Sequence, residues 1–297
     1  MVSMNRLSTE KRAAVIASLV EGNSIRATVR MTGVAKATVT KLLVDMGTVC
    51  SIHQDKLMRD LTCERLQCDE IWAFVYAKEK NVPEHKRGEA GDVWTWVAID
   101  ADTKLVPSYR LGPRDLNTAT AFISDLAGRL THRVQLTTDG HHSYLQAVRG
   151  VFKGEIDYAQ LHKKYGTPSQ ATPERRYSPA VCIGTDKRPI SGDPDPDHIS
   201  TSYIERQNLT MRMSMRRYTR LTNAFSKKVE NLAAAVSLHF AYYNLCRVHS
   251  SLKTTPAVSA GVTDHVWTLT ELIGLLEEAE ATPIRRGSYV KRQQISD

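Results

Sequence analysis

Apolar positions recur at helical spacing over much of the chain, and three such stretches come first. Residues 11–20, 24–31 and 35–46 carry apolar side chains three and four positions apart, which predicts three short helices. Breaks at Gly22 and Gly33 separate them. Two helices joined by a short glycine-containing turn are typical of a helix-turn-helix.

The apolar pattern then changes to that of a strand. Residues 66–77 are largely apolar on both faces, as in a central strand covered on each side. Asp69 and Glu70 lie within it, and an acid there is costly unless it is paired or binds a cation. A structural ion pair and a metal ion would each explain these acids.

Strands and helices alternate after this point. We expect two strands at 92–100 and 104–110, a helix from 117 to 130 and a short strand from 134 to 138 that stops at Asp139. Open α/β sheets bind ligands at the carboxyl ends of their strands, which makes Asp139 a candidate ligand. By itself, the favoured alternative is that Asp139 caps the helix that follows.

The second half of the chain begins with an irregular stretch and continues as helices. Residues 154–199 are rich in proline, lysine and arginine without periodicity, so we expect an extended basic excursion over the surface. A helix over 199–221 follows, then helices over 225–246 and 269–280 and a basic tail at 285–292. In the first of these helices one stripe is apolar: Ile204, Met211, Met215 and Tyr218. Beside it lies a polar row: Glu205, Asn208, Arg212 and Arg216.

Charge points to a polyanionic partner. The 297 residues include 40 Lys and Arg against 32 Asp and Glu, a net charge of +8. Within the helix-turn-helix, the side chains that would face a major groove are Lys36, Thr38, Thr40 and Lys41. The alternative is a small three-helix bundle that binds protein.

Cysteine usage and hydropathy suggest a reducing compartment. Five scattered cysteines do not resemble a disulfide framework. A zinc site formed by Cys50, His53, Cys63 and Cys68 is an alternative to buried reduced thiols, but the spacing lacks the paired short loops of a zinc ribbon. The absence of a long apolar run predicts a cytosolic protein.

Taken in order, three acidic motifs carry a family resemblance. They are the run Gln67-Cys68-Asp69-Glu70-Ile71-Trp72, the run Thr137-Thr138-Asp139-Gly140 and the run Tyr203-Ile204-Glu205-Arg206-Gln207-Asn208. A downstream Tyr243-Asn244-Leu245-Cys246-Arg247-Val248-His249 run strengthens it. The chain resembles a DDE transposase of the insertion-sequence type, closest to the IS1-like group.

This resemblance implies a fold and a division of the chain. The expected fold is α/β, with a ribonuclease H-like mixed five-stranded sheet flanked by helices, an amino-terminal all-α helix-turn-helix module and a helical carboxy-terminal extension. The expected parts are a DNA-binding module at 1–49, a linker at 50–63, a catalytic core at 64–222 with a basic proline-rich insertion at 154–198, and a helical region with a basic tail at 223–297.

The resemblance also implies a metal-binding triad of Asp69, Asp139 and Glu205. Three carboxylates that hold two Mg²⁺ (or Mn²⁺) ions would relieve charge on the attacking and leaving oxygens of a phosphodiester. The stretch between Asp139 and Glu205 is longer than in compact relatives, and other acids near it are alternatives for the third ligand: Glu155, Glu174 and Asp197. Without metal, mutual repulsion would raise the pKa values of the acids.

The implied activity is cleavage and joining of DNA strands at the ends of a mobile element. Phosphate contacts are expected from the late helix, at Asn208, Arg212, Arg216 and Arg217. The implied partner is double-stranded DNA, at element ends and target, bound by a homodimer or higher oligomer in the bacterial cytoplasm and nucleoid. Two alternatives stay open, a non-catalytic DNA-binding regulator derived from a transposase and a nuclease of the same fold.

Overall fold

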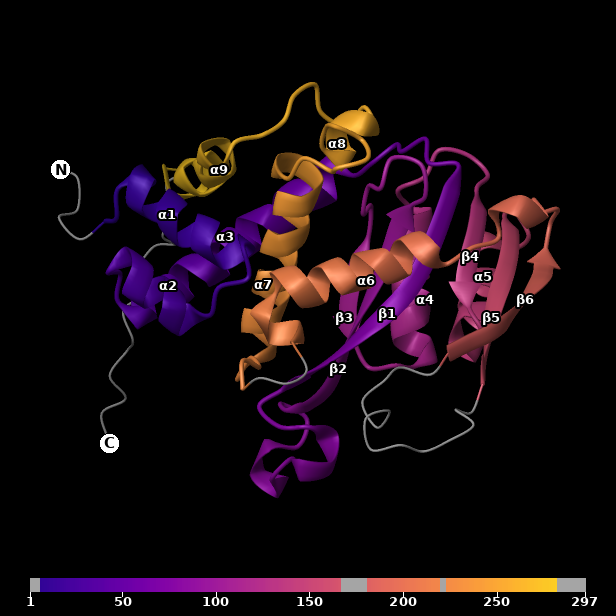
Figure 1. Ribbon diagram of the computed structural model, residues 1–297, viewed down its shortest axis with the longest axis horizontal. Coiled ribbons are helices and arrows are strands. Elements are labelled where there is room, and N and C mark those ends of the chain that lie inside the picture. The colour runs from indigo at the N-terminus through magenta and orange to yellow at the C-terminus, as the bar shows by residue number, and fades with distance from the viewer. Residues whose placement is uncertain (1–5, 167–180, 220–222, 282–297) are drawn as a thin grey trace, which may run out of the picture.

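A computed structural model describes residues 6–166, 181–219 and 223–281 (Figure 1). Six strands form one mixed sheet in the order β3-β2-β1-β4-β5-β6, with helices on both faces. The strands are β1 (Arg65–Val75), β2 (Gly91–Asp100), β3 (Tyr109–Gly112), β4 (Gln135–Asp139), β5 (Asp157–Gly166) and β6 (Val181–Ser191). The expected α/β architecture with flanking helices is confirmed, but the sheet has six strands and not five.

The topology centres on β1. β1, β2 and β3 are antiparallel neighbours, whereas β4 and β5 run parallel to β1 and to each other, and β6 returns antiparallel to β5. In the parallel pair, Cys68 lies opposite Thr138, so the next residues along the two strands are Asp69 and Asp139. Parallel pairing thereby brings the first two acidic motifs to one place in the sheet.

The sixth strand comes from the proline-rich stretch, where the expectation of an irregular excursion was wrong. β5 and β6 pair with one another at the edge of the sheet, and Pro189 lies opposite Ala159. An edge strand tolerates proline, because one of its sides makes no ladder hydrogen bonds. Lysines and arginines on the exposed parts of both strands conceal the alternation that would predict them. The remainder of this stretch, residues 167–180, lies outside the described residues.

Helices cover both faces of the sheet (Figure 1). α4 (Leu116–Ala127) and α5 (His142–Phe152) lie on one face, and α6 (Ser202–Ser214) crosses the other over β1 and β2. α6 is shorter than expected and is followed by a single 3₁₀ turn, Arg216–Tyr218. The four residues of the predicted apolar stripe are all buried, but only Ile204 and Met211 lie in α6, whereas Met215 and Tyr218 follow its end.

The amino-terminal helices are continuous with the rest of the molecule. They are α1 (Thr9–Val20), α2 (Ile25–Thr32) and α3 (Lys36–Leu57). α3 does not end near residue 46, and residues 50–57, expected to be part of a linker, are its last two turns. They stay helical because their buried side chains, including Cys50 and Gln54, continue the packed stripe of the helix.

Carboxy-terminal helices hold α3 in position. α7 (Val229–Ala241), which ends in a π-helical turn at Tyr242–Cys246, packs along α3, and α9 (Leu269–Ala281) packs on α1 and α3. A Cβ atom on Gly47 of α3 would lie 2.3 Å from the carbonyl oxygen of Ala234, so the two helix backbones touch there. Arg12, 5% exposed, donates to both oxygens of Glu280 on α9. A short helix, α8 (Pro256–Ser259), lies between α7 and α9.

One apolar core runs from the amino-terminal helices to the sheet, with Ile16 of α1, Leu43 of α3 and Leu66 of β1 all in it. None of the described helices combines the length and apolar character that a membrane crossing requires. The expected basic tail at 285–292 lies outside the described residues.

Candidate metal centre

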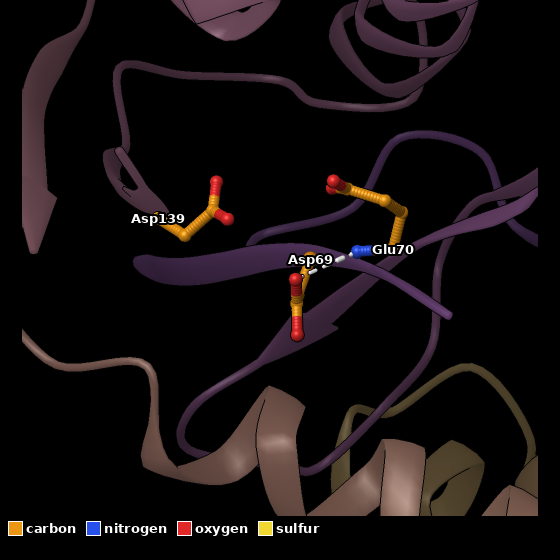
Figure 2. A group of neighbouring side chains, drawn as sticks. All are labelled: Asp69, Glu70 and Asp139. Carbon is orange, nitrogen blue, oxygen red and sulfur yellow. Dashed lines mark hydrogen bonds between the residues drawn. The ribbon is translucent and has the colours of Figure 1, made fainter. Parts of the chain in front are cut away.

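Three carboxylates converge where β1 and β4 lie side by side (Figure 2). One oxygen each from Asp69, Glu70 and Asp139 lie within 4.8 Å of one another. Asp69 and Glu70 are neighbours on β1 and point to opposite sides of the strand, whereas Asp139 comes from the end of β4. All the donors are oxygen atoms, which are the ligands that Mg²⁺ and Mn²⁺ prefer.

Asp69 faces α6. Its Oδ1 accepts from the backbone N–H of Glu70 at 2.8 Å, and its Oδ2 accepts from the Asn208 side-chain amide at 2.9 Å. Burial raises the pKa of Asp69 to about 7, and the charges of Glu70, Asp139 and Glu205 add to this effect. The expected rise in pKa is therefore present, but desolvation contributes more to it than repulsion does.

Glu70 faces the layer of α4 and α5 and is buried. Its Oε1 accepts from Arg114 Nε at 2.5 Å, and its Oε2 accepts from the Tyr144 hydroxyl at 3.1 Å. Burial raises the pKa of Glu70, the charge of Asp139 raises it further, and Arg114 opposes both. The sequence left open whether an ion pair or a metal explains the two acids of β1. At Glu70, the structure shows an ion pair with Arg114.

Asp139 is not the cap of the following helix. The N-cap of α5 is His141, whose ring nitrogen accepts from the backbone N–H of Ser143. Asp139 accepts from the backbone N–H of His141 at 3.0 Å and keeps its other oxygen toward Arg114 Nη2, 3.8 Å away. A Cβ atom on Gly140, which lies between them, would be 2.5 Å from the ring of His162, so a side chain at this position would have to displace that ring.

Glu205 lies on the same cavity but outside the group of three. Its Oε2 accepts from Lys163 Nζ at 2.5 Å and its Oε1 accepts from the Thr201 hydroxyl at 2.6 Å. Its side chain is 43% exposed. Its charge is nevertheless among those that raise the pKa of Asp69, so it is within electrostatic reach of the centre.

These groups share a cavity of about 940 Å³. Basic side chains line it together with the acids: Arg114, His141, His162, Lys163 and Arg212. Asn208 also lines it and is 4% exposed, and among the described residues its Oδ1 has no hydrogen-bond partner. A buried carbonyl oxygen left unpaired beside carboxylates is a fitting donor for a cation or its water.

The other predicted DNA-binding residues fall into two groups. Asn208 and Arg212 line the cavity. Arg216 is exposed and does not line it, and the half-buried Arg217 donates to the Ser226 hydroxyl at 2.8 Å. On α3, Lys36, Thr38 and Lys41 are exposed, and Thr40 is half-buried with its hydroxyl donating to the carbonyl of Lys36. Lys41 is paired with Asp45 one turn on.

The structure does not assemble the alternative zinc site. Cys50, Cys63 and Cys68 are free and buried, and His53 packs against the Trp267 ring. Within residues 6–166, 181–219 and 223–281, the acids of β1 and β4 are the only group of three or more His, Cys, Asp or Glu close enough to share an ion. Burial is the main cause that raises the pKa of Cys63 to about 12, so this thiol stays protonated at neutral pH.

Comparisons with known proteins give distant likenesses. No protein-family model and no curated protein matches the sequence. Among solved structures, the chain is similar to a Mos1 transposase paired-end complex with left transposon end, at 14% identity and a TM-score of 0.24 over 53% of this chain and 60% of that one.

Two further structures give similar values. One is a piggyBac transposase synaptic complex with hairpin DNA, at 8% identity and a TM-score of 0.34 over 95% of this chain and 75% of that one. The other is endonuclease V from Bacillus subtilis, at 18% identity and a TM-score of 0.22 over 63% and 87% of the two chains. The chain thus spans about 60% of the Mos1 structure.

Proposed function

We propose that this protein is a metal-dependent DNA transposase of the insertion-sequence type, related to the IS1-like group. It would cut DNA at the ends of a mobile element and join the freed 3′-hydroxyl groups to target DNA. The observation that carries the proposal is the convergence of Asp69 and Asp139 from adjacent parallel strands, on a cavity that Glu205 and several basic side chains also line. Synapsis of two element ends in the bacterial cytoplasm would require at least a dimer.

The donor set fits Mg²⁺ or Mn²⁺. Asp69 and Asp139 would hold the ions, and Glu205 would join them after exchanging Lys163 for metal. Bound divalent ions would lower the pKa of the attacking hydroxyl or water and stabilise the charge on the leaving oxygen.

The protein's own side chains would orient these acids and bind the substrate. Asn208 holds one oxygen of Asp69, which keeps that carboxylate turned toward α6. Lys163 and Arg212 line the cavity, and each would neutralise a phosphate of a DNA backbone bound there. Lys36, Thr38, Thr40 and Lys41 on α3 would read the element end in a major groove.

The test uses duplexes taken from the DNA on either side of the gene. Asp139→Asn should lower Mg²⁺-dependent strand cleavage by at least 10³-fold, because it removes a carboxylate ligand, and should leave duplex binding within about threefold. The control is Asp193→Asn, an exposed acid outside the cavity, which should cleave like the wild type. Retained cleavage by Asp139→Asn, or a wild type that binds but never cuts, would refute the proposal.

A second assay separates joining from hydrolysis. A pre-cut duplex with a free 3′-hydroxyl is mixed with supercoiled plasmid, and covalent products longer than the input are measured. Joined products support a transposase, whereas cleavage without joining would reassign the protein to the nucleases of the same fold.

A further inference from the structure

A buried acid beside the metal centre has no part in the proposed triad. The Glu70 side chain is 1% exposed, and its cross-strand neighbour on β2 is the fully buried Trp96. Both of its oxygens are used, one by Arg114 and one by Tyr144. A carboxylate in such surroundings is stable only while its oxygens are hydrogen-bonded, so Glu70 is committed to these two partners.

Arg114, in turn, is fixed on three sides. Its Nε donates to Glu70, its guanidinium carbon lies 4.8 Å from the centre of the Trp94 ring, and its Nη2 is 3.8 Å from Asp139 Oδ2. Its side chain is 38% exposed and lines the cavity of the metal centre. A guanidinium has five N–H donors, and the bond to Glu70 uses only the one on Nε.

We infer that Arg114 forms a phosphate-binding subsite beside the metal centre, and that Glu70 is a positioning residue that holds Arg114 and does not ligate metal. The planar pair of terminal NH₂ groups matches two oxygens of a phosphodiester. Stacking on Trp94 and the bond to Glu70 set the plane of the guanidinium before DNA arrives, so binding costs little side-chain entropy. The inference rests on the proposed function, since the DNA backbone supplies the phosphate.

The competing role for Glu70 is that of a metal ligand. Its carboxylate lies as close to Asp69 and Asp139 as a shared ion requires. To bind an ion, however, Glu70 would have to give up Arg114 or Tyr144, although its own side chain is 1% exposed. Loss of the bond from Tyr144 would leave a fully buried hydroxyl unpaired, and loss of Arg114 would remove the charge that neutralises Glu70, so both exchanges are costly.

The experiment compares Glu70→Gln, Arg114→Ala and the double variant with the wild type. The matched control is Arg149→Ala, an exposed arginine on α5 outside the cavity. Mn²⁺ affinity is measured by electron paramagnetic resonance without DNA, duplex affinity by fluorescence anisotropy without divalent ions, and cleavage with Mg²⁺. Glu70→Gln keeps the shape of the buried side chain, and near-ultraviolet circular dichroism checks that each variant is folded.

We expect Glu70→Gln to keep Mn²⁺ affinity within about threefold of the wild type, and Arg114→Ala to keep or raise it, because that variant removes a positive charge next to Asp139. Arg114→Ala should weaken duplex binding about tenfold and cleavage by 10- to 100-fold, the usual effect of losing a charge-assisted hydrogen bond to phosphate. Glu70→Gln should show a smaller loss of the same kind, and the double variant should be no worse than Arg114→Ala, because Glu70 acts through Arg114. Added guanidinium ion should partly restore cleavage by Arg114→Ala.

Two results would overturn the inference. A tenfold or greater loss of Mn²⁺ affinity in Glu70→Gln, comparable with that of Asp139→Asn, would make Glu70 a ligand. Unchanged duplex binding and cleavage in Arg114→Ala would remove the phosphate subsite. If the wild type cuts no DNA, the proposed function fails, yet the Mn²⁺ and duplex affinities still test the roles of Glu70 and Arg114.

Discussion

At the scale of single residues, the site is a balance between acids and the cations that hold them. Arg114 forms an ion pair with Glu70 and lies near Asp139, and Lys163 forms an ion pair with Glu205. These side chains offset the negative charge of the acids within the protein. Under the proposed function, metal binding would exchange these internal cations for divalent ions.

Replacing Lys163 by Met tests this exchange. The variant frees Glu205 and removes a positive charge from the cavity, so Mn²⁺ affinity should rise by about three- to tenfold, the equivalent of about 1 kcal/mol. Duplex affinity should fall, because a phosphate contact is lost. Isothermal titration with Mn²⁺ and anisotropy with duplex DNA measure the two effects.

The control is the neighbouring residue on β5. Lys164 is exposed and points to the other face of the strand, so Lys164→Met should leave Mn²⁺ affinity unchanged. Equal changes in the two variants would mean that general charge, and not the bond to Glu205, governs the affinity.

At the scale of elements, helices pack closely enough for one methyl group to matter. α3 and α7 touch at Gly47 and Ala234, where a Cβ atom on the glycine would lie within 2.3–2.6 Å of three backbone atoms. Backbone cannot swing aside as a side chain can. The crossing of the two helices therefore depends on glycine at this position.

Gly47→Ala should lower the free energy of unfolding by about 3 kcal/mol, because two helix backbones must separate. Gly150→Ala on α5 is the matched control, since nothing lies within 4 Å of its added Cβ. That change should stabilise the protein by about 0.5–1 kcal/mol through helix propensity. Urea unfolding measures both, and a neutral Gly47→Ala would contradict the close contact.

Local pattern predicted most of the elements, and long-range pairing explains what it missed. The buried stripe of α6 and the central position of β1 follow from spacing alone. β6 was missed because it is an edge strand that buries little, and β5 was missed because only its first half, next to β4, is buried and its second half carries two lysines. The end of α3 was missed because its contact with α7 uses glycine, cysteine and glutamine, which do not form a conventional apolar stripe.

The same limit applies to the site. Family motifs single out Asp69 and Asp139, and the parallel register brings them together. Arg114 is 44 residues from Glu70 along the chain, and Lys163 is 42 residues from Glu205. No local pattern relates such partners, and only the folded sheet reveals them.

At the scale of the whole molecule, the predicted DNA-reading helices and the metal centre belong to one packed body. α3 begins at the exposed Lys36 and ends against the same core that supports β1. α9 packs on α1 and α3, and its Glu280 forms an ion pair with Arg12 of α1. The exposed start of α3 and the cavity of acids are nevertheless made of different residues. Under the proposed function, mutations should therefore separate DNA recognition from catalysis.

Lys36→Ala and Lys41→Ala test that separation. Each should weaken duplex binding several-fold and reduce the salt slope of binding by about one, because each removes one positive charge that would neutralise a DNA phosphate. Mn²⁺ affinity should stay at the wild-type value, since neither lysine lines the cavity. Arg149→Ala again serves as the control, and a binding affinity unchanged by both lysine variants would leave α3 without a role on DNA.

The unbroken course of α3 has a consequence for the DNA itself. Its 22 residues make a rod of about 33 Å, close to the roughly 34 Å repeat of the double helix. One added residue would turn the far end of the rod by about 100° and shift it by about 1.5 Å. Under the proposed function, a helix of this fixed length would set how many base pairs separate the recognised sequence from the nick, and element ends with altered spacing would be bound without being cut.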